Sequence, residues 1–127
     1  MKNAKDAHGE SGHPPRDFVM EVIETLPEAQ CVPHEAHLSL EVRSKRFAWF
    51  LDDHHGDGRV SLHVKSTDTR RSQLISTLPD QAFIPSHVGR FGWVGLWLDV
   101  DSVDWQAVRC VLVDGYRSVA PKSLLAK

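Results

Sequence analysis

The sequence predicts an α+β fold of two layers, in which an antiparallel sheet carries helices mainly on one face. Two stretches near the ends of the chain repeat apolar residues at helical spacing, and three stretches between them alternate apolar and polar residues as half-buried strands do. Short turns join these strands, which is typical of an antiparallel meander. At 127 residues the chain has the length of one domain.

The first predicted helix follows a polar N-terminal stretch. Residues 1–14 contain glycines and a proline but no apolar run, so we expect a disordered tail there and a single domain over residues 15–127. Apolar residues recur from Phe18 to Leu26 and Pro27 stops the pattern, which predicts a helix over residues 15–26. The two prolines of residues 27–36 predict irregular structure.

Strands and two further helices follow. Three strands are predicted over residues 38–42, 46–52 and 59–65, with turns at Ser44-Lys45 and at the glycines between the last two. Ser66 or Thr67 caps a short helix that ends near Leu78. The remaining expected elements are a short extended piece at 82–84, a strand at 93–99, a helix from near Asp104 to the residue before Pro121, and one more turn in 123–127.

Alternation along the strands assigns residues to the two faces of the sheet. The face toward the helices is expected to hold Leu38, Leu40, Val42, Phe47, Trp49, Leu51, Val60, Leu62, Val64, Val94, Leu96 and Leu98. The opposite face, open to solvent in a two-layer domain, is expected to hold Arg46, Ala48, Phe50, Arg59, Ser61, His63, Lys65, Trp93, Gly95 and Trp97.

Two tryptophans on an open face are unusual, because exposed aromatic patches generally mark a contact surface. Trp93 and Trp97, with Arg46, His63 and Lys65, are candidates to stack a ring and pair a phosphate. Two other interpretations stay open. Another part of the chain covers the tryptophans, or the face forms a homodimer, where aromatic residues are also enriched.

The composition limits the partners. The formal net charge of −2 gives no global attraction to nucleic acid or to anionic membranes, so such binding requires a local basic patch. The sequence has neither an apolar N-terminal signal nor a stretch long enough to span a bilayer, so we expect a cytoplasmic protein without a membrane partner. Two isolated cysteines fit a reducing compartment.

No catalytic or metal site is predicted. Candidate metal ligands are Cys31, His34 and His37 at short spacing, and His54 and His55 near Asp52, Asp53 and Asp57. Structural zinc normally needs two paired ligand clusters, and the spacing here is unusual. The sequence contains no nucleophile elbow or phosphate loop, and the acidic clusters fit turns and helix caps, so we predict no cofactor and no catalytic residue.

One loop is a weak anion-site candidate. In the stretch from His87 to Trp93, Gly89 and Gly92 flank Arg90 just before a strand. Backbone N–H groups at glycines can converge on an anion, and Arg90 can pair with it. The alternative is a turn at the strand entry, with Arg90 paired to a carboxylate.

The segment from His87 to Lys122 resembles the MmcQ/YjbR family. The matching residues are Val88, Gly89, Arg90, Gly92, Trp93 and Val94, then Asp104-Trp105, Tyr116 and Val119-Ala120-Pro121-Lys122. Lys45, Phe47 and Ala48 resemble the first hairpin of the family, and Lys65 the end of its third strand. Residues 36–40 depart from its Gly-His-Pro-x-Phe segment.

This resemblance implies a YjbR-like two-layer fold similar to that of secretion chaperones, with DNA binding as the customary function and no catalytic residues. Together with the tryptophan face and the glycine loop, it leads to three hypotheses. The first is a DNA- or nucleotide-binding module that uses Lys65, Arg90, Lys122 and the Trp93 face. The second is a protein-interaction module, homodimeric or with another partner. The third is a small-ligand site on the Trp93/Trp97 face or in a pocket between the Gly89–Gly92 loop and Lys122.

Overall fold

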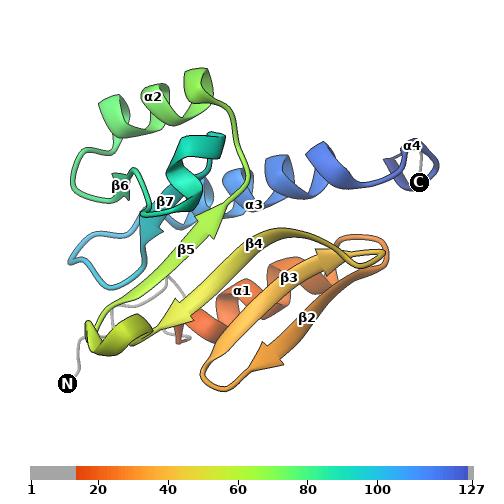
Figure 1. Cartoon of the computed structure of the whole chain (residues 1–127), viewed down its shortest axis with the longest axis horizontal. Coiled ribbons are helices and arrows are strands. Elements are labelled where there is room, and N and C mark those ends of the chain that lie inside the picture. The colour runs from red at the N-terminus through yellow and green to blue at the C-terminus, as the bar shows by residue number, and fades with distance from the viewer. Residues whose placement is uncertain (1–13, 126–127) are drawn as a thin grey trace.

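The computed structural model describes residues 14–125. The predicted tail therefore lies outside the described residues except for Pro14. The structure is an α+β fold with a six-stranded sheet in the order β2-β3-β4-β5-β7-β6, and all neighbouring strands are antiparallel (Figure 1). The strands are β2 (Ala29–His34), β3 (His37–Val42), β4 (Lys45–Asp52), β5 (Val60–Val64), β6 (Ala82–Phe83) and β7 (Val94–Trp97).

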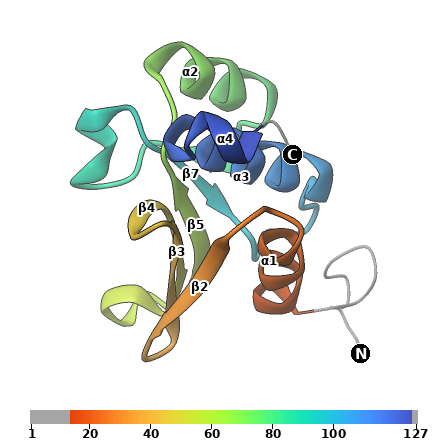
Figure 2. The ribbon, with the colours of Figure 1, turned by 90° about the vertical axis from the view of Figure 1, so that its right-hand side faces the viewer.

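Helices lie mainly on one face of the sheet, as predicted. Figure 2 shows the sheet nearly edge-on, with α1 and α3 on one side of it. The helical elements are α1 (Pro15–Glu24), η1 (His54–Gly56), α2 (Asp68–Thr77), η2 (Val88–Phe91), α3 (Trp105–Val119) and α4 (Lys122–Leu125). Among residues 14–125, none of these helices combines the length and apolar character needed to cross a bilayer.

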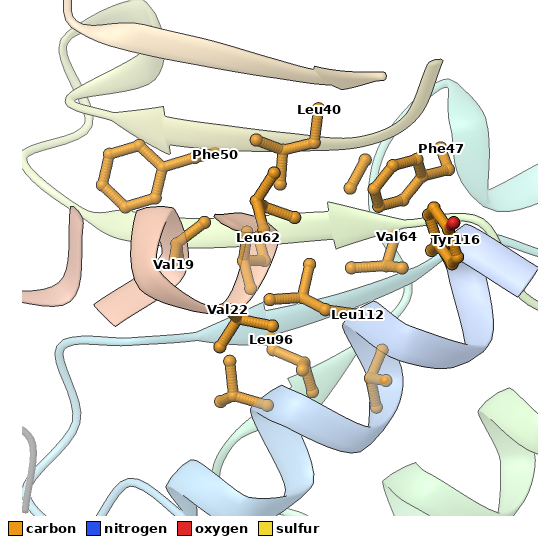
Figure 3. Close-up of a cluster of buried hydrophobic side chains, with 14 of the residues drawn as sticks. Val19, Val22, Leu40, Phe47, Phe50, Leu62, Val64, Leu96, Leu112 and Tyr116 are labelled. Carbon is orange, nitrogen blue, oxygen red and sulfur yellow. The ribbon is translucent and has the colours of Figure 1, made fainter. Parts of the chain in front are cut away.

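The core lies between the sheet and these two helices (Figure 3). Leu38, Phe50, Leu62 and Leu96 stand side by side across four strands, and each is almost fully buried. The apolar stripe of α3 packs on them, including Val108 and Leu112. Side-chain oxygens of Thr67 and Asp104 accept from backbone N–H groups in the first turns of α2 and α3, so the predicted helix starts are correct to a residue or two.

The prediction for residues 27–36 was wrong, because Ala29–His34 form the edge strand β2. The segment pairs with β3 in an unbroken register from Ala29 opposite Val42 to His34 opposite His37. Pro33 fits because an edge strand has no second neighbour that requires its missing N–H. Proline content alone therefore gave a misleading signal.

The face assignment of β4 was also wrong. A bulge opposite Leu40 and Glu41 makes Phe47 an extra residue, since Leu40 pairs with Ala48 and Glu41 with Arg46. Such a bulge shifts the alternation by one residue and turns the following side chains to the other face. Ala48 and Phe50 therefore join Phe47 in the core, and Trp49 and Leu51 belong to the open face.

Candidate functional site

A concave pocket lies on the open face of the sheet, away from α1 and α3. Its floor consists of side chains in two adjacent rows of the ladder. Trp49 pairs with His63, and Leu51 pairs with Ser61, which in turn pairs with Trp97. All five line one cavity of about 650 Å³, a volume typical of small-molecule sites. The bulge in β4 thus creates this floor, because without it Trp49 and Leu51 would point into the core.

Histidines form one wall. The chain reverses between β3 and β4, so the start of β3 and the end of β4 meet at the same end of the sheet. His37 comes from the first, and His54, His55 and Asp57 come from the turn that contains η1. The ring centroids of His54 and His55 lie 3.9 Å apart, and those of His37 and His54 lie 5.5 Å apart.

The loop after β6 forms the opposite wall. Phe83 contributes from β6, Ile84, Ser86 and His87 line the cavity from the connection to η2, and Val88 lines it from the first position of η2. In Figure 2 this teal loop and the yellow-green turn of η1 both project from the face opposite α1 and α3. The pocket therefore has a floor of sheet residues and a wall on either side.

The ring of Trp97 is already in contact with other side chains of the protein. Phe83 stacks on it with centroids 4.2 Å apart and an interplanar angle of 20°. The guanidinium carbon of Arg59 lies 3.8 Å from its centroid. Phe83 and Arg59 approach from β6 and from the start of β5, the strands on either side of β7. Arg59 is in turn fixed by two hydrogen bonds of 2.9 Å to Asp99.

Arg71 of α2 holds the second wall in place. Its Nη1 donates to the carbonyl oxygens of Gly89 and Trp93, and its Nη2 contacts Asp68 at 3.4 Å. The side chain of Arg71 is largely buried against this loop. The glycine loop therefore binds an internal cation through its carbonyl groups, which differs from the anion site that the two glycines suggested.

The pocket lining carries no fixed positive charge among the described residues. Burial, with a smaller effect of the nearby His54 ring, lowers the pKa of His63 to about 4. Burial also lowers the pKa of His54, helped by the imidazoles of His55, His37 and His87, while Asp57 opposes the shift. His54 and His63 are thus neutral near pH 7 and act as hydrogen-bonding groups.

The candidate residues of the sheet face have different surroundings. His63 and Trp97 lie in the floor of the pocket. Arg46 is outside the lining, where its guanidinium carbon lies 4.2 Å from the Trp49 centroid and its Nε donates to Ser39 at 2.7 Å. Lys65 is exposed just beyond the end of β5 and is also outside the lining.

The candidates from the family segment do not gather at the pocket. Arg90 is exposed, with its guanidinium carbon 4.8 Å from the Phe91 centroid. Trp93 is half-buried and outside the lining. Lys122 begins α4, which lies at the far end of the long axis from η1 and β6 (Figure 1). The structure therefore brings together two of the seven candidates at this cavity, His63 and Trp97.

The candidate metal ligands are only partly assembled. His37 and His54 approach each other, but His34 packs its ring against Trp49 at 5.3 Å and Cys31 lies in β2. Burial raises the pKa of the Cys31 thiol, which disfavours the thiolate that metals bind. Within residues 14–125 no three histidine, cysteine or acidic side chains are arranged to hold a metal ion.

Most of the pocket does not follow from the sequence pattern. In the sequence the histidines of its first wall stand only as candidate metal ligands, and Phe83 stands only in a short extended piece. The approach of His37 and His54 could have been predicted from the hairpin. Residue 37 begins one strand and residue 54 follows the end of the next, so antiparallel pairing places both at the same end of the sheet. The position of Trp49 was not readable, since it depends on the bulge.

Comparison with known proteins adds evidence on the fold. No protein-family profile and no curated protein matches the sequence. The fold is similar to that of Deinococcus radiodurans protein DR2400, which contains a DUF419 domain. The TM-score is 0.68 over 85% of this chain and 80% of that chain, with 23% sequence identity. At this identity the likeness establishes a shared α+β fold, in agreement with the predicted class.

Proposed function

We propose that this protein binds a small organic molecule in the pocket on the open face of its sheet. The observation that carries the proposal is the cavity of about 650 Å³, which is built from two walls around an aromatic floor. Pockets of this size, mostly apolar with a few converging polar groups, are the usual sites of small ligands. This is the third of the hypotheses that the sequence raised, with Trp49 in place of Trp93.

The chemistry of the lining supports a ligand with an apolar body. Trp49, Leu51 and Phe83 offer apolar surface, and burying such surface gains about 25 cal/mol per Å². The histidines, with Ser61 and Ser86, supply hydrogen bonds that orient the molecule. Because the faces of Trp97 are already engaged by Phe83 and Arg59, this ring contributes shape rather than a stacking platform.

A ligand-induced melting shift tests the proposal. We expect a panel of small aromatic and aliphatic molecules to contain compounds that raise the Tm of the wild type. Ser61 is a buried floor residue, so Ser61→Leu should fill the cavity and abolish the shift. Ser76→Leu, the same change on the exposed surface of α2, should leave it intact. Equal shifts in both variants would place the ligand elsewhere.

Membership of the MmcQ/YjbR family forms part of the proposal. Its supports are the motif residues from Val88 to Lys122 and the fold shared with a DUF419 domain, a domain family related to YjbR and MmcQ. Several motif residues have structural roles. Tyr116, for example, donates to the carbonyl oxygen of Pro27 at 2.8 Å. We also propose a cytoplasmic location, since two isolated cysteines fit a reducing compartment.

DNA is the alternative occupant that the family resemblance suggests. It would use the exposed cations Lys65, Arg90 and Lys122, which do not border the pocket. Phosphate contacts release counterions, so true nucleic-acid binding must weaken steeply with salt. A salt titration of duplex and single-stranded binding distinguishes the two. Absence of binding at low salt would exclude DNA as the ligand. A binding constant that falls steeply with salt would favour DNA over the small molecule.

A protein partner, or a second copy of the chain, is favoured by two exposed apolar side chains. Ile84 at the pocket rim is 61% exposed and Phe91 is 63% exposed, both in the loop that forms the second wall. Sedimentation of the wild type and of Phe91→Ser tests this alternative. Self-association of the wild type that the variant loses would support it, and two monomers would count against a dimer.

A further inference from the structure

We infer that the ligand is an organic acid, an apolar molecule whose carboxylate is held by the imidazoles of His37, His54 and His55 and whose binding takes up a proton. The inference rests on the proposed function and specifies the chemical class that the pocket selects. It concerns the wall formed by the start of β3 and by η1, and none of the predicted site residues lies in this wall.

The three imidazoles form a compact cluster with His54 at its centre. Its ring centroid lies 3.9 Å from that of His55 and 5.5 Å from that of His37. Nδ1 of His37 accepts from the backbone N–H of Asp52 at 3.1 Å, so a neutral His37 carries its proton on Nε2 and keeps a donor there. All three line the same cavity, where a single anionic group can contact more than one of them.

The described side chains around the three histidines offer no fixed positive charge to the carboxylate of a bound ligand. Asp57 lines the same wall and adds negative rather than positive charge there, and its Oδ1 accepts from the backbone N–H of Arg59. The Arg59 side chain is paired with Asp99, and Asp53 accepts from the backbone N–H of Gly58. His63 faces the cluster from β5 and His87 from the loop before η2. Positive charge for a bound carboxylate must therefore come from protonation of an imidazole.

Crowding explains why the free pocket does not already hold that charge. Burial and the neighbouring imidazoles of His55, His37 and His87 lower the pKa of His54, so the free protein near neutral pH favours the neutral ring of His54. A carboxylate between the rings reverses this balance because it stabilises the imidazolium form. By linkage, affinity for the acid should rise as pH falls through the range in which the free histidines titrate.

The apolar floor selects the remainder of the molecule. Trp49 and Leu51 lie beside Ser61 and can bury a ring or an alkyl chain next to the histidine wall. A free inorganic anion would leave this surface unused. The inference therefore specifies an acid with a hydrophobic body, and it distinguishes this class from neutral and cationic molecules of the same shape.

Three matched probes test the inference: 2-naphthoate, 2-naphthamide and 2-naphthylmethylamine. Isothermal titration at pH 7.5 and pH 5.5, in buffers of different ionisation enthalpy, gives the affinity and the protons taken up. A carboxylate with a pKa near 4 stays ionised throughout this range. We expect naphthoate to bind roughly tenfold more tightly at pH 5.5 with net proton uptake, and naphthamide to be insensitive to pH.

Substitution of the central histidine supplies the control. In His54→Asn the naphthoate affinity should fall at pH 5.5 and its pH dependence should shrink, while naphthamide is little affected. His34→Asn removes a histidine outside the lining and should keep the full pH dependence. Equal, pH-independent binding of acid and amide, or tighter binding of the amine, would overturn the inference and leave the proposed pocket standing. Binding of none of the three would overturn both.

Discussion

The ring of Phe83 lies directly over Gly95, in the space that a side chain at position 95 would occupy. A Cβ atom built on Gly95 would lie 2.3 Å from Cζ of Phe83, closer than such atoms approach in proteins. The two residues are paired across β6 and β7, and the same Phe83 ring stacks on Trp97. The glycine at position 95, between Trp93 and Trp97, is therefore explained by the Phe83 ring, which occupies the space that a side chain would need.

Gly95→Ala should destabilise the protein because Phe83 must move. We expect the free energy of unfolding, measured by urea denaturation, to fall by about 1–3 kcal/mol, as for overpacked interiors. The double variant tests the cause. In a Phe83→Ala background the same Gly95→Ala change should cost much less, since the ring it meets is gone. An equal cost in both backgrounds would show that this contact is not responsible.

Asp99→Asn should loosen the arrangement around Trp97. Asp99 accepts two hydrogen bonds from the Arg59 side chain and one from the backbone N–H of Val60. Since both side chains are partly exposed, we expect a loss of about 1 kcal/mol in the free energy of unfolding. The tryptophan emission spectrum of the protein should also change, because Arg59 is no longer held over the ring of Trp97. Arg43→Gln, which breaks the exposed pair with Glu28, should leave that emission unchanged.

The pair also has a pH signature. Burial acts to raise the pKa of Asp99, but the hydrogen bonds from Arg59 and Val60 outweigh it and hold the pKa below its ordinary value. Because the folded-state pKa is lowered, this contribution is complete above the unfolded pKa, near 4, and is lost as pH falls below it. The difference in the free energy of unfolding between the wild type and Asp99→Asn should therefore become smaller as the pH falls below about 4.

His63 gives the protein a separate sensitivity to mild acid. Burial is the main cause that lowers its pKa to about 4, from an ordinary value near 6.5. Between pH 6.5 and about 4, His63 is protonated in the unfolded chain but stays neutral in the folded protein. The free energy of unfolding therefore decreases as the pH falls through this range. The loss should be on the order of 1 kcal/mol per pH unit at most.

Urea denaturation between pH 7.5 and 4.5 measures this effect. We expect the wild-type free energy of unfolding to decline below pH 6.5, and His63→Gln to show a shallower decline. His34→Gln, a matched change at an exposed residue of β2, should keep the wild-type slope. Parallel slopes for wild type and His63→Gln would mean that His63 is not the group that titrates.

Arg71→Lys should release the second wall while it preserves the charge. Lysine lacks the planar fork with which Arg71 reaches both Gly89 and Trp93, so two backbone carbonyls lose their donor. We expect a loss of about 1–2 kcal/mol and faster amide hydrogen exchange in residues 88–92. Arg70→Lys, one residue earlier and paired with exposed Asp114, should change neither. Unchanged exchange in Arg71→Lys would contradict this role.

The sequence predicted the fold well because its main signals are local. The stripes of α1 and α3, the caps at Thr67 and Asp104, and the alternation of β3 and β5 depend on nearby residues, and each matched the structure. Strand β2 was missed because its evidence is non-local. An edge strand that contains proline is recognisable only through the partner with which it pairs.

The site was less predictable than the fold, for two physical reasons. A bulge beside Phe47 changes the phase of all later residues in β4, and alternation alone cannot reveal where an extra residue sits. Trp49 was therefore expected in the core. In addition, Phe83 covers Gly95 from a two-residue strand, too short to give a pattern. His63 and Trp97 lie on the face where alternation places them, because β5 and β7 are regular.

The central claim is that a small molecule binds on the open face, and the indole N–H signals of the four tryptophans test it directly. Trp49 and Trp97 line the pocket, Trp93 lies outside it, and Trp105 packs against Phe18 in the core. In two-dimensional ¹H–¹⁵N NMR titrations with 2-naphthoate, 2-naphthamide and 2-naphthylmethylamine in turn, we expect the probe that binds to give saturating shifts of Trp49 and Trp97, while Trp93 and Trp105 stay in place. Saturating shifts of Trp93 alone, or no shift at any of the four tryptophans with any of the three probes, would contradict the claim.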